Sequence, residues 1–387
     1  MLEPVRPLPA ELVSLLSPQI DGRSAAETLH ARVPLPGFDN SAMDGYAVRA
    51  ADAGVPGARL EIRGQAAAGS APQESLNAGT AVRIFTGAPI PRGADAVIMQ
   101  EDVTVEPTGR FLSVVDPVKP WENIRFQGED TRPGEALVPA GTSLGPHHVA
   151  ALLASGWEQV PVHRRPRVAI ITNGSELRPP GSSLAAGQIH ESNSGMLAAL
   201  VRRAGAMVVS TEWVPDAPDL LRSALESAAS QGDVILTAGG ASVGDHDLVR
   251  PALVAAGGAL DFWRIDMKPG KPFLQGTLMG VPLLGLPGNP VSAFVTAVLF
   301  VLPVLRRLQG SRGEPHPASV AIWADDVENT DRRRHYIRIT KDADGRIRPS
   351  GPQASHRLAS LAAADGLAEI PGKTRIPAGS TARILTW

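Results

Sequence analysis

Cysteine is absent from the 387-residue chain, and aromatic residues make up only 4% of it. The lack of cysteine excludes disulfides, zinc–thiolate sites, iron–sulfur ligation and a cysteine nucleophile. The shortage of aromatic residues argues against a stacking surface for single-stranded nucleic acid. Neither sign of charge is in large excess. The chain has 37 Lys and Arg and 39 Asp and Glu, which gives a net charge of −2. Any anion site must therefore be a local arrangement, and we expect no nucleic-acid partner.

Long apolar runs are also missing. The longest, residues 291–305, contains Ser292, Thr296 and Pro303 and is shorter than the roughly 20 residues that cross a bilayer. The N-terminus has no apolar core behind a basic start, so it is a poor secretory signal. We therefore expect a cytoplasmic protein with no membrane partner.

Glycine and proline are abundant instead, with 39 and 35 residues spread without a period. That pattern indicates many turns and short strands. At about 150 residues per domain, the length predicts two or three domains.

The first half of the chain changes character twice. Residues 1–44 and 145–165 are predicted to form a helical linker domain, with helices over 10–16, 24–30 and 145–156. Residues 45–144 are predicted to form an inserted β domain, because short apolar runs alternate there with Gly/Pro turns. The expected strands are 59–63, 81–85, 96–99 and 110–115.

The second half begins with regular strand–helix alternation. Residues 166–310 therefore predict a doubly wound α/β domain with a parallel sheet and ligands at the carboxyl ends of its strands. Within it, Asp216 is expected to N-cap a helix over 219–230. Residues 316–387 return to β patterning and predict a C-terminal β domain.

Two turns in the α/β region have the pattern of ligand sites. Residues 237–247 (TAGGASVGDHD) follow a buried strand, and their glycines allow backbone N–H groups to approach an oxyanion. Residues 286–292 (LPGNPVS) place Asn289 at an N-cap and Pro290 at the first helical position. Each turn alone is also compatible with simple strand-to-helix geometry without a ligand.

Lysines and carboxylates supply the candidate charges. Lys268 and Lys271 lie three residues apart in a Pro-rich turn, which suits a phosphate or another dianion but also a solvated loop. Many acids lie in loops, where each alone is more often a cap or a solvated charge. Together they could place oxygen ligands around Mg²⁺; the acids in question are Glu176, Asp216, Asp245 and Asp247.

Six ordered motifs resemble the molybdopterin molybdenumtransferase family, which includes the E domain of gephyrin. They are PGFDNSAMDGYAVR (36–49), FTGAP (85–89), GED (128–130), GGASVGDHD (239–247), KPGKP (268–272) and LPGNPVSA (286–293). The resemblance runs from Pro34 to the C-terminus. It implies four domains: a helical linker, a β insertion, a doubly wound molybdopterin-binding domain and a C-terminal β-barrel-like domain.

The resemblance also implies the chemistry and the site. Its members take adenylylated molybdopterin, supplied by an upstream molybdopterin adenylyltransferase, and molybdate; with Mg²⁺ they form molybdenum cofactor and release AMP. They work as homodimers, and the active site lies between one chain's doubly wound domain and its partner's β insertion. Family functional positions, taken as catalytic, are Asp44, Thr86, Asp130, Glu176, Asp247, Lys268 and Lys271. Substrate-binding positions by the resemblance are Asp216, Pro287, Pro290, Arg338 and Ser355, together with Arg264 where the family often has lysine. From the two turns we add Gly239, Gly240, Ser242 and Asn289 as substrate-binding residues. The metal positions are Glu176, Asp245 and Asp247.

Two alternatives remain open. One is adenylylation of molybdopterin by ATP, which uses a similar doubly wound domain but leaves the 36–49 motif unexplained. The other is a scaffold, because gephyrin's E domain also clusters receptors.

Overall fold

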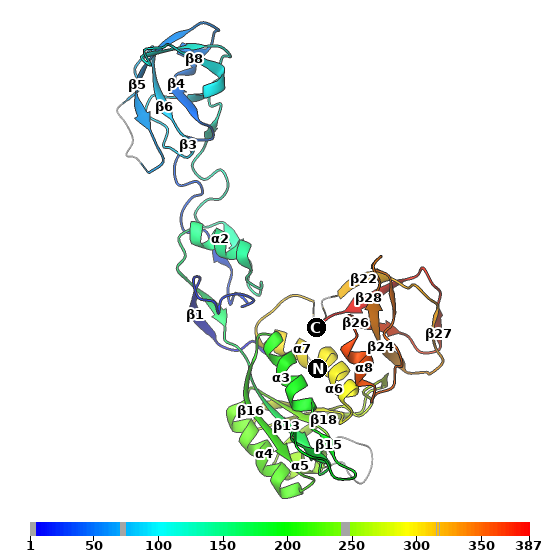
Figure 1. The fold of residues 1–387 in the computed structure, drawn as a ribbon. Coiled ribbons are helices and arrows are strands. Elements are labelled where there is room, and N and C mark those ends of the chain that lie inside the picture. Colours follow the sequence, from blue (N-terminus) through cyan, green and yellow to red (C-terminus); the bar gives the residue numbers. More distant parts are fainter. Residues whose placement is uncertain (1–4, 70–74, 241–247, 315, 317) are drawn as a thin grey trace.

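The fold was taken from a computed structural model, which describes residues 5–69, 75–240, 248–314, 316 and 318–387. Figure 1 shows an extended molecule. A β sheet built from the first third of the chain lies at one end, and a short linker region connects it to the α/β sheet at the other end. The C-terminal strands pack beside the α/β sheet.

The linker region is mostly extended chain rather than helix. Strand β1 (Ala10–Ser14) pairs antiparallel with β12 (Gln159–His163), so the helix predicted over 10–16 is wrong. The helix predicted over 24–30 is also wrong, because this segment ends in β2 (Leu29–His30), which pairs with β11 (Ala136–Val138). The third predicted helix is confirmed as α2 (Pro146–Ala154).

Pairing explains the difference. Leu15 is buried and Val13 half-buried, whereas Leu12 and Leu16 are exposed. This period of two suits a strand whose inner face packs on Val160 and Val162. A single core holds the linker region together.

The inserted β domain is one mixed sheet with strand order β7-β4-β6-β5-β9-β8. Its strands are β4 (Gly45–Val48), β5 (Arg59–Ala66), β6 (Thr80–Ile84), β7 (Ala96–Met99), β8 (Val103–Val105) and β9 (Phe111–Val114), with α1 (Ala50–Ala53) and a 3₁₀ turn (Gln100–Asp102) beside them. Below the sheet, β3 (Asn40–Ser41) pairs with β10 (Ile124–Arg125). All four predicted strands are present, each within a few residues of its expected bounds.

The α/β sheet has the order β16-β13-β17-β21-β20-β18. Its first four strands run parallel, β20 runs antiparallel to both of its neighbours, and β18 again runs in the direction of the first four. The strands are β13 (Arg167–Asn173), β16 (Met207–Val214), β17 (Val234–Ala238), β18 (Ala259–Trp263), β20 (Leu274–Leu278) and β21 (Val281–Leu286). The sheet is therefore mixed rather than wholly parallel as expected.

Helices cover both faces of this sheet. On one face, side chains of α3 (Asn193–Arg203), α6 (Pro290–Thr296) and α7 (Leu302–Leu308) pack in the core with Val168 and Ile170. On the other, α4 (Pro218–Gln231) and α5 (Val249–Ala255) pack with Ala169 and Ile171. Successive residues of β13 thus point into opposite cores, which is the doubly wound arrangement.

The helix over Pro290–Leu308 is the most apolar helix of those that the structure describes as long enough to cross a membrane. It combines α6, a π-helical turn (Ala297–Val301) and α7, and it is long and apolar enough to span a membrane by length and composition. In the structure 83% of its most apolar window is buried. Its apolarity is therefore explained by its position in the α/β core.

The C-terminal region is rich in sheet. Strands β19, β24, β26, β28 and β22 form one sheet in that order, β25 pairs with β24, and β23 pairs with β27. The bounds are β19 (Met267–Lys268), β22 (Ala318–Ile322), β23 (Val327–Asn329), β24 (Arg334–Lys341), β25 (Ile347–Pro349), β26 (Gly366–Ile370), β27 (Thr374–Ile376) and β28 (Thr381–Leu385), with helix α8 (Leu358–Ala362). Because β19 belongs to the α/β chain segment, its pairing with β24 joins the two regions.

Candidate functional site

The carboxyl ends of β17 and β21 bring the two predicted turns together. These strands are parallel neighbours, and the N–H of Gly239 donates to the carbonyl of Leu286 over 3.3 Å. A Cβ on Gly288 would lie 3.5 Å from the Cα of Gly239. The prediction that these turns lie side by side is confirmed for Gly239, Gly240 and residues 286–292. Ser242, Asp245 and Asp247 lie outside the described residues.

A cavity of about 720 Å³ opens at this edge of the sheet. Its volume falls in the range of small-molecule sites, roughly 300–1,000 Å³. The predicted site residues that line it come from six separate segments and are Glu176, Asp216, Gly239, Gly240, Lys268, Lys271, Pro287, Asn289, Pro290 and Ser355.

Lys268 and Lys271 lie on the connection between β18 and β20, where the Lys268–Pro269 peptide is cis. Both lysines are exposed and line the cavity. The backbone of Lys268 is also held in place by the pairing of β19 with β24. Arg264, on the same connection, does not line the cavity and places its guanidinium 3.8 Å from the Trp263 ring centre. The connection therefore presents two cations to the cavity from an anchored loop.

Asp216 lines the same cavity but does not cap a helix. Its carboxylate accepts a 2.9 Å hydrogen bond from the N–H of Ser175, whose hydroxyl in turn accepts one from the N–H of Asp216. The N-cap of α4 is Ala217, with Pro218 in its first turn, so the capping prediction is wrong. The reciprocal pair fixes the Asn173–Glu176 loop against the end of β16.

Asn289 and Pro290 occupy the N-cap and first-turn positions of α6, as predicted. The Asn289 side chain does not bond the helix and instead donates to the Ser355 hydroxyl over 3.3 Å. This contact connects the α/β domain with a C-terminal loop at the cavity.

Arg338 lies behind that loop rather than in the cavity. It is fully buried, and its guanidinium donates to the Ser360 hydroxyl and to the carbonyls of Pro352 and Ala354. Burial lowers the pKa of Arg338. We therefore place it as a residue that positions Gln353, Ala354 and Ser355.

Two asparagines were missed in the sequence. Asn173 and Asn193 line the cavity and are only 4% and 8% exposed. Their amide groups donate to the carbonyls of Val214 and Gly288, whereas neither Oδ1 has a partner among the described residues. Buried acceptors without partners are costly, so they suit a ligand that brings N–H groups. The only available signal was their place just after a strand and just before a helix.

A second group of predicted residues lies at the base of the inserted β domain. The Thr86 N–H and hydroxyl both donate to Asp44 Oδ1 over 2.8 Å, and these bonds lower the pKa of Asp44. Asp130 is exposed, and its N–H donates to the carbonyl of Leu35 over 3.0 Å. Motifs 36–49, 85–89 and 128–130 thus meet, because Gly87 also donates to Ser41 and Gly128 to Pro36.

The two groups are far apart within one chain. Figure 1 places β3 and β4, which flank Asp44, at the opposite end of the molecule from β13 and β18 of the α/β sheet. The linker region lies between them. Asp44, Thr86 and Asp130 are therefore not brought to the cavity by their own chain.

Metal ligands are incomplete in the described part of the chain, where no group of three His, Asp or Glu side chains is close enough to hold an ion. Glu176 and Asp216 contribute carboxylates to the cavity wall. Carboxylate oxygens are suitable ligands for Mg²⁺. The remaining predicted ligands, Asp245 and Asp247, lie outside the described residues.

Three protein-family models match consecutive regions of the chain and together cover most of its length. Residues 1–156 match the model of the MoeA N-terminal region (domain I and II), 169–307 match a probable molybdopterin binding domain, and 320–387 match the MoeA C-terminal region (domain IV).

Individual relatives cover nearly the full length. The chain is 36% identical over 366 residues to the molybdopterin molybdenumtransferase of Haemophilus influenzae, covering 93% of this chain and 90% of the relative. It is 37% identical to molybdopterin molybdenumtransferase 2 of Mycobacterium tuberculosis, covering 96% and 92%. A crystal structure of the molybdopterin biosynthesis MoeA protein of Pyrococcus horikoshii OT3 superposes with a TM-score of 0.86 at 32% identity, covering 100% of this chain and 97% of that one.

Proposed function

Because the chain belongs to the MoeA family of molybdenum cofactor biosynthesis enzymes, we propose that it transfers molybdenum from molybdate to adenylylated molybdopterin and releases AMP. The observation that carries this proposal is the 720 Å³ cavity where Gly239, Pro287 and the two lysines meet. It combines room for a pterin nucleotide with cations for its phosphate and for molybdate. The cysteine-free protein offers no thiolate, so the substrate's own dithiolene would provide the sulfur ligands of molybdenum.

The lysines and backbone donors would bind the two anions. Lys268 and Lys271 neutralise the phosphate and molybdate, which carboxylates alone would repel. Pro290 and Ser292, in the first turn of α6, also line the cavity, and the N-terminal end of a helix favours negative charge. Each preorganised donor or cation of this kind contributes roughly 3 kcal/mol to a transition state.

The buried acceptors Asn173 Oδ1 and Asn193 Oδ1 would bind the pterin. A pterin ring carries N–H donors on one edge, and pairing them removes the cost of two unpaired buried oxygens. A ring without those donors would leave both oxygens unpaired, which is a strong basis for discrimination.

Mg²⁺ is proposed as the metal, with Glu176, Asp245 and Asp247 as its ligands. When bound, it would polarise the adenylyl phosphate and neutralise charge as AMP leaves. Asp216 would act differently, because its carboxylate is already occupied by the Ser175 N–H.

A homodimer is proposed to complete the site. Asp44, Thr86 and Asp130 of one chain would face Lys271 and Asp247 of the other, since no chain brings them to its own cavity (Figure 1). Exposed apolar side chains beside these acids support a covered surface there; they are Phe38, Met43, Trp121 and Phe126. A twofold axis would then generate two identical composite sites.

Release of AMP from adenylylated molybdopterin tests the proposal. The expected result is release that requires molybdate and is abolished by removing Mg²⁺ with a chelator. The competing activity, adenylylation of molybdopterin, predicts the opposite: consumption of ATP and accumulation of the adenylylated product without molybdate. No AMP release by a folded protein would contradict the proposal.

A further inference from the structure

A second cavity, of about 560 Å³, lies where the linker region meets the α/β domain. It shares no lining residue with the cavity at the carboxyl edge of the sheet. Five arginines line it: Arg23, Arg165, Arg202, Arg203 and Arg306. Asp21 and Glu314 are the acids of the lining, which leaves an excess of three positive charges.

Part of this charge is already paired. Arg23 forms an ion pair with Glu11 and donates to the carbonyl of His163 over 2.8 Å. Glu314 lies 3.9 Å from Arg383, so its charge is partly directed away from the cavity. Arg202 and Arg203 are exposed and form no ion pair with any residue that the structure describes. The cavity therefore retains cations whose charge is not matched by its own acids.

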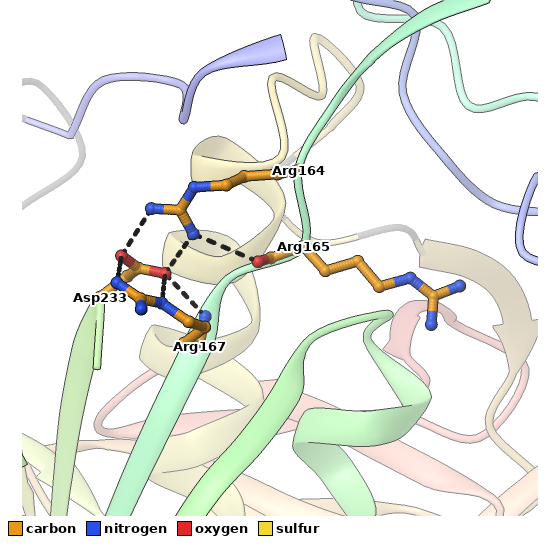
Figure 2. Close-up of polar contacts among 4 residues, drawn as sticks. All are labelled: Arg164, Arg165, Arg167 and Asp233. Carbon is orange, nitrogen blue, oxygen red and sulfur yellow. Dashed lines mark hydrogen bonds and ion pairs between the residues drawn. The ribbon is translucent and has the colours of Figure 1, made fainter. Parts of the chain in front are cut away.

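Arg165 is the most informative of these residues. Its neighbours Arg164 and Arg167 both bind Asp233, with Arg164 making two bonds of 2.6 and 2.7 Å. Figure 2 shows the Arg165 side chain extending away from this cluster. Its Nε is buried without a hydrogen-bond partner in the described part of the chain, and one Nη makes only a 3.4 Å contact with the carbonyl of Gln19. A buried N–H of a guanidinium without an acceptor is costly, and a bound anion would remove that cost.

Helix dipoles account for only some of the arginines. Arg202 and Arg203 lie in the last turn of α3, and Arg306 in the last turn of α7, where cations stabilise the helix ends. Arg165 lies on no helix, between β12 and β13. It nevertheless extends to the same cavity. Stabilisation of helix ends therefore does not explain why arginines from α3, from α7 and from the β12–β13 connection line one cavity.

We propose that this junction cavity binds a phosphorylated small molecule. Guanidinium groups bind phosphate oxygens with paired N–H donors, and several of them together favour a ligand with more than one negative charge. The volume exceeds that of a lone phosphate and lies in the range of organic ligands. Because the lining comes from both the linker region and the α/β domain, the bound ligand would stabilise their relative arrangement.

Calorimetric titration with inorganic pyrophosphate tests this site. The protein is the Lys268→Ala/Lys271→Ala double variant, in which the cations of the first cavity are absent. We expect saturable binding that Arg165→Gln weakens by at least about tenfold, because it removes charge-assisted hydrogen bonds. Arg203→Gln, at an exposed position, should also weaken binding without a risk to folding.

Arg222→Gln is the matched control, since Arg222 is exposed on α4 and lies outside the cavity. It removes the same charge and should leave the affinity unchanged. Absence of binding in the double-lysine variant, or equal weakening by all three arginine variants, would overturn the proposal. Molybdate-dependent AMP release by Arg165→Gln alone is expected to persist, so failure here is distinct from failure of the proposed enzyme activity.

Discussion

Gly239 and Leu286, which are 47 positions apart in the chain, are joined by a 3.3 Å backbone hydrogen bond. This bond unites two turns in one cavity wall at the carboxyl edge of the sheet. Gly239 has a φ of +97°, and a Cβ there would lie 2.2 Å from the carbonyl oxygen of Asn173. The position therefore requires glycine for two independent reasons.

Gly239→Ala is expected to lower the free energy of unfolding by at least about 2 kcal/mol, because strain and a backbone clash add. Gly257→Ala provides the control, since Gly257 has a φ of +79° but open space around its Cβ. That variant should lose only about 1 kcal/mol. Denaturant unfolding measures both, and equal losses would contradict a close approach at Gly239.

Lys268→Ala and Lys271→Ala are expected to weaken molybdate binding and slow turnover. Both side chains are exposed, so the free energy of unfolding should change by less than about 0.5 kcal/mol. Steady-state kinetics and thermal unfolding of the same preparations separate the two effects. Unchanged kinetics in both variants would make the turn an ordinary solvated loop.

Asp233→Asn is expected to destabilise the connection between linker and α/β domain by about 2–3 kcal/mol. Burial alone would raise the pKa of Asp233, but hydrogen bonds from Arg164 and Arg167 outweigh it and hold the pKa well below its usual range. The resulting stability is complete above the ordinary pKa of about 4 and is lost as pH falls below it. The exposed pair Asp326–Arg375 is the control, and Asp326→Asn should destabilise the protein far less, because solvent screens that ion pair.

His335 is expected to make the protein acid-sensitive. Burial, reinforced by Lys268 and Arg338, lowers the pKa of His335 to about 4. The unfolded chain takes up this proton near pH 6.5, so stability falls between about pH 6.5 and 4, by at most about 1.4 kcal/mol per pH unit. The free energy of unfolding, measured across this pH range, should lose this dependence on pH in His335→Gln. It should keep it in His356→Gln, because the side chain of His356 is exposed.

The sequence predicted those features that depend on local pattern. Buried strands such as β13 and β17 are continuous apolar runs, and Asn289-Pro290 marks the start of α6. Edge strand β18 and its partner β20 were missed, because Gln275, Gly276 and Thr277 interrupt the apolar pattern and the pairing is set by tertiary contacts.

The site shows the same division. The glycines and lysines could be found because a Gly-rich turn and a Pro-bounded cation pair have recognisable chemistry. Asn173 could not, because an asparagine acquires meaning only when its Oδ1 is buried without a partner. Arg338 was found by resemblance, yet its position behind the Gln353–Ser355 loop follows from packing that no motif encodes.

The shared site is the central claim, and subunit mixing tests it most directly. Asp130→Ala and Lys271→Ala proteins are each expected to be strongly impaired in molybdate-dependent AMP release. After the two are unfolded and refolded together, half of the dimers are expected to be mixed, and each of these contains one site with neither substitution. The account predicts recovery of about a quarter of the wild-type rate; exchange of subunits without any recovery of activity would contradict it.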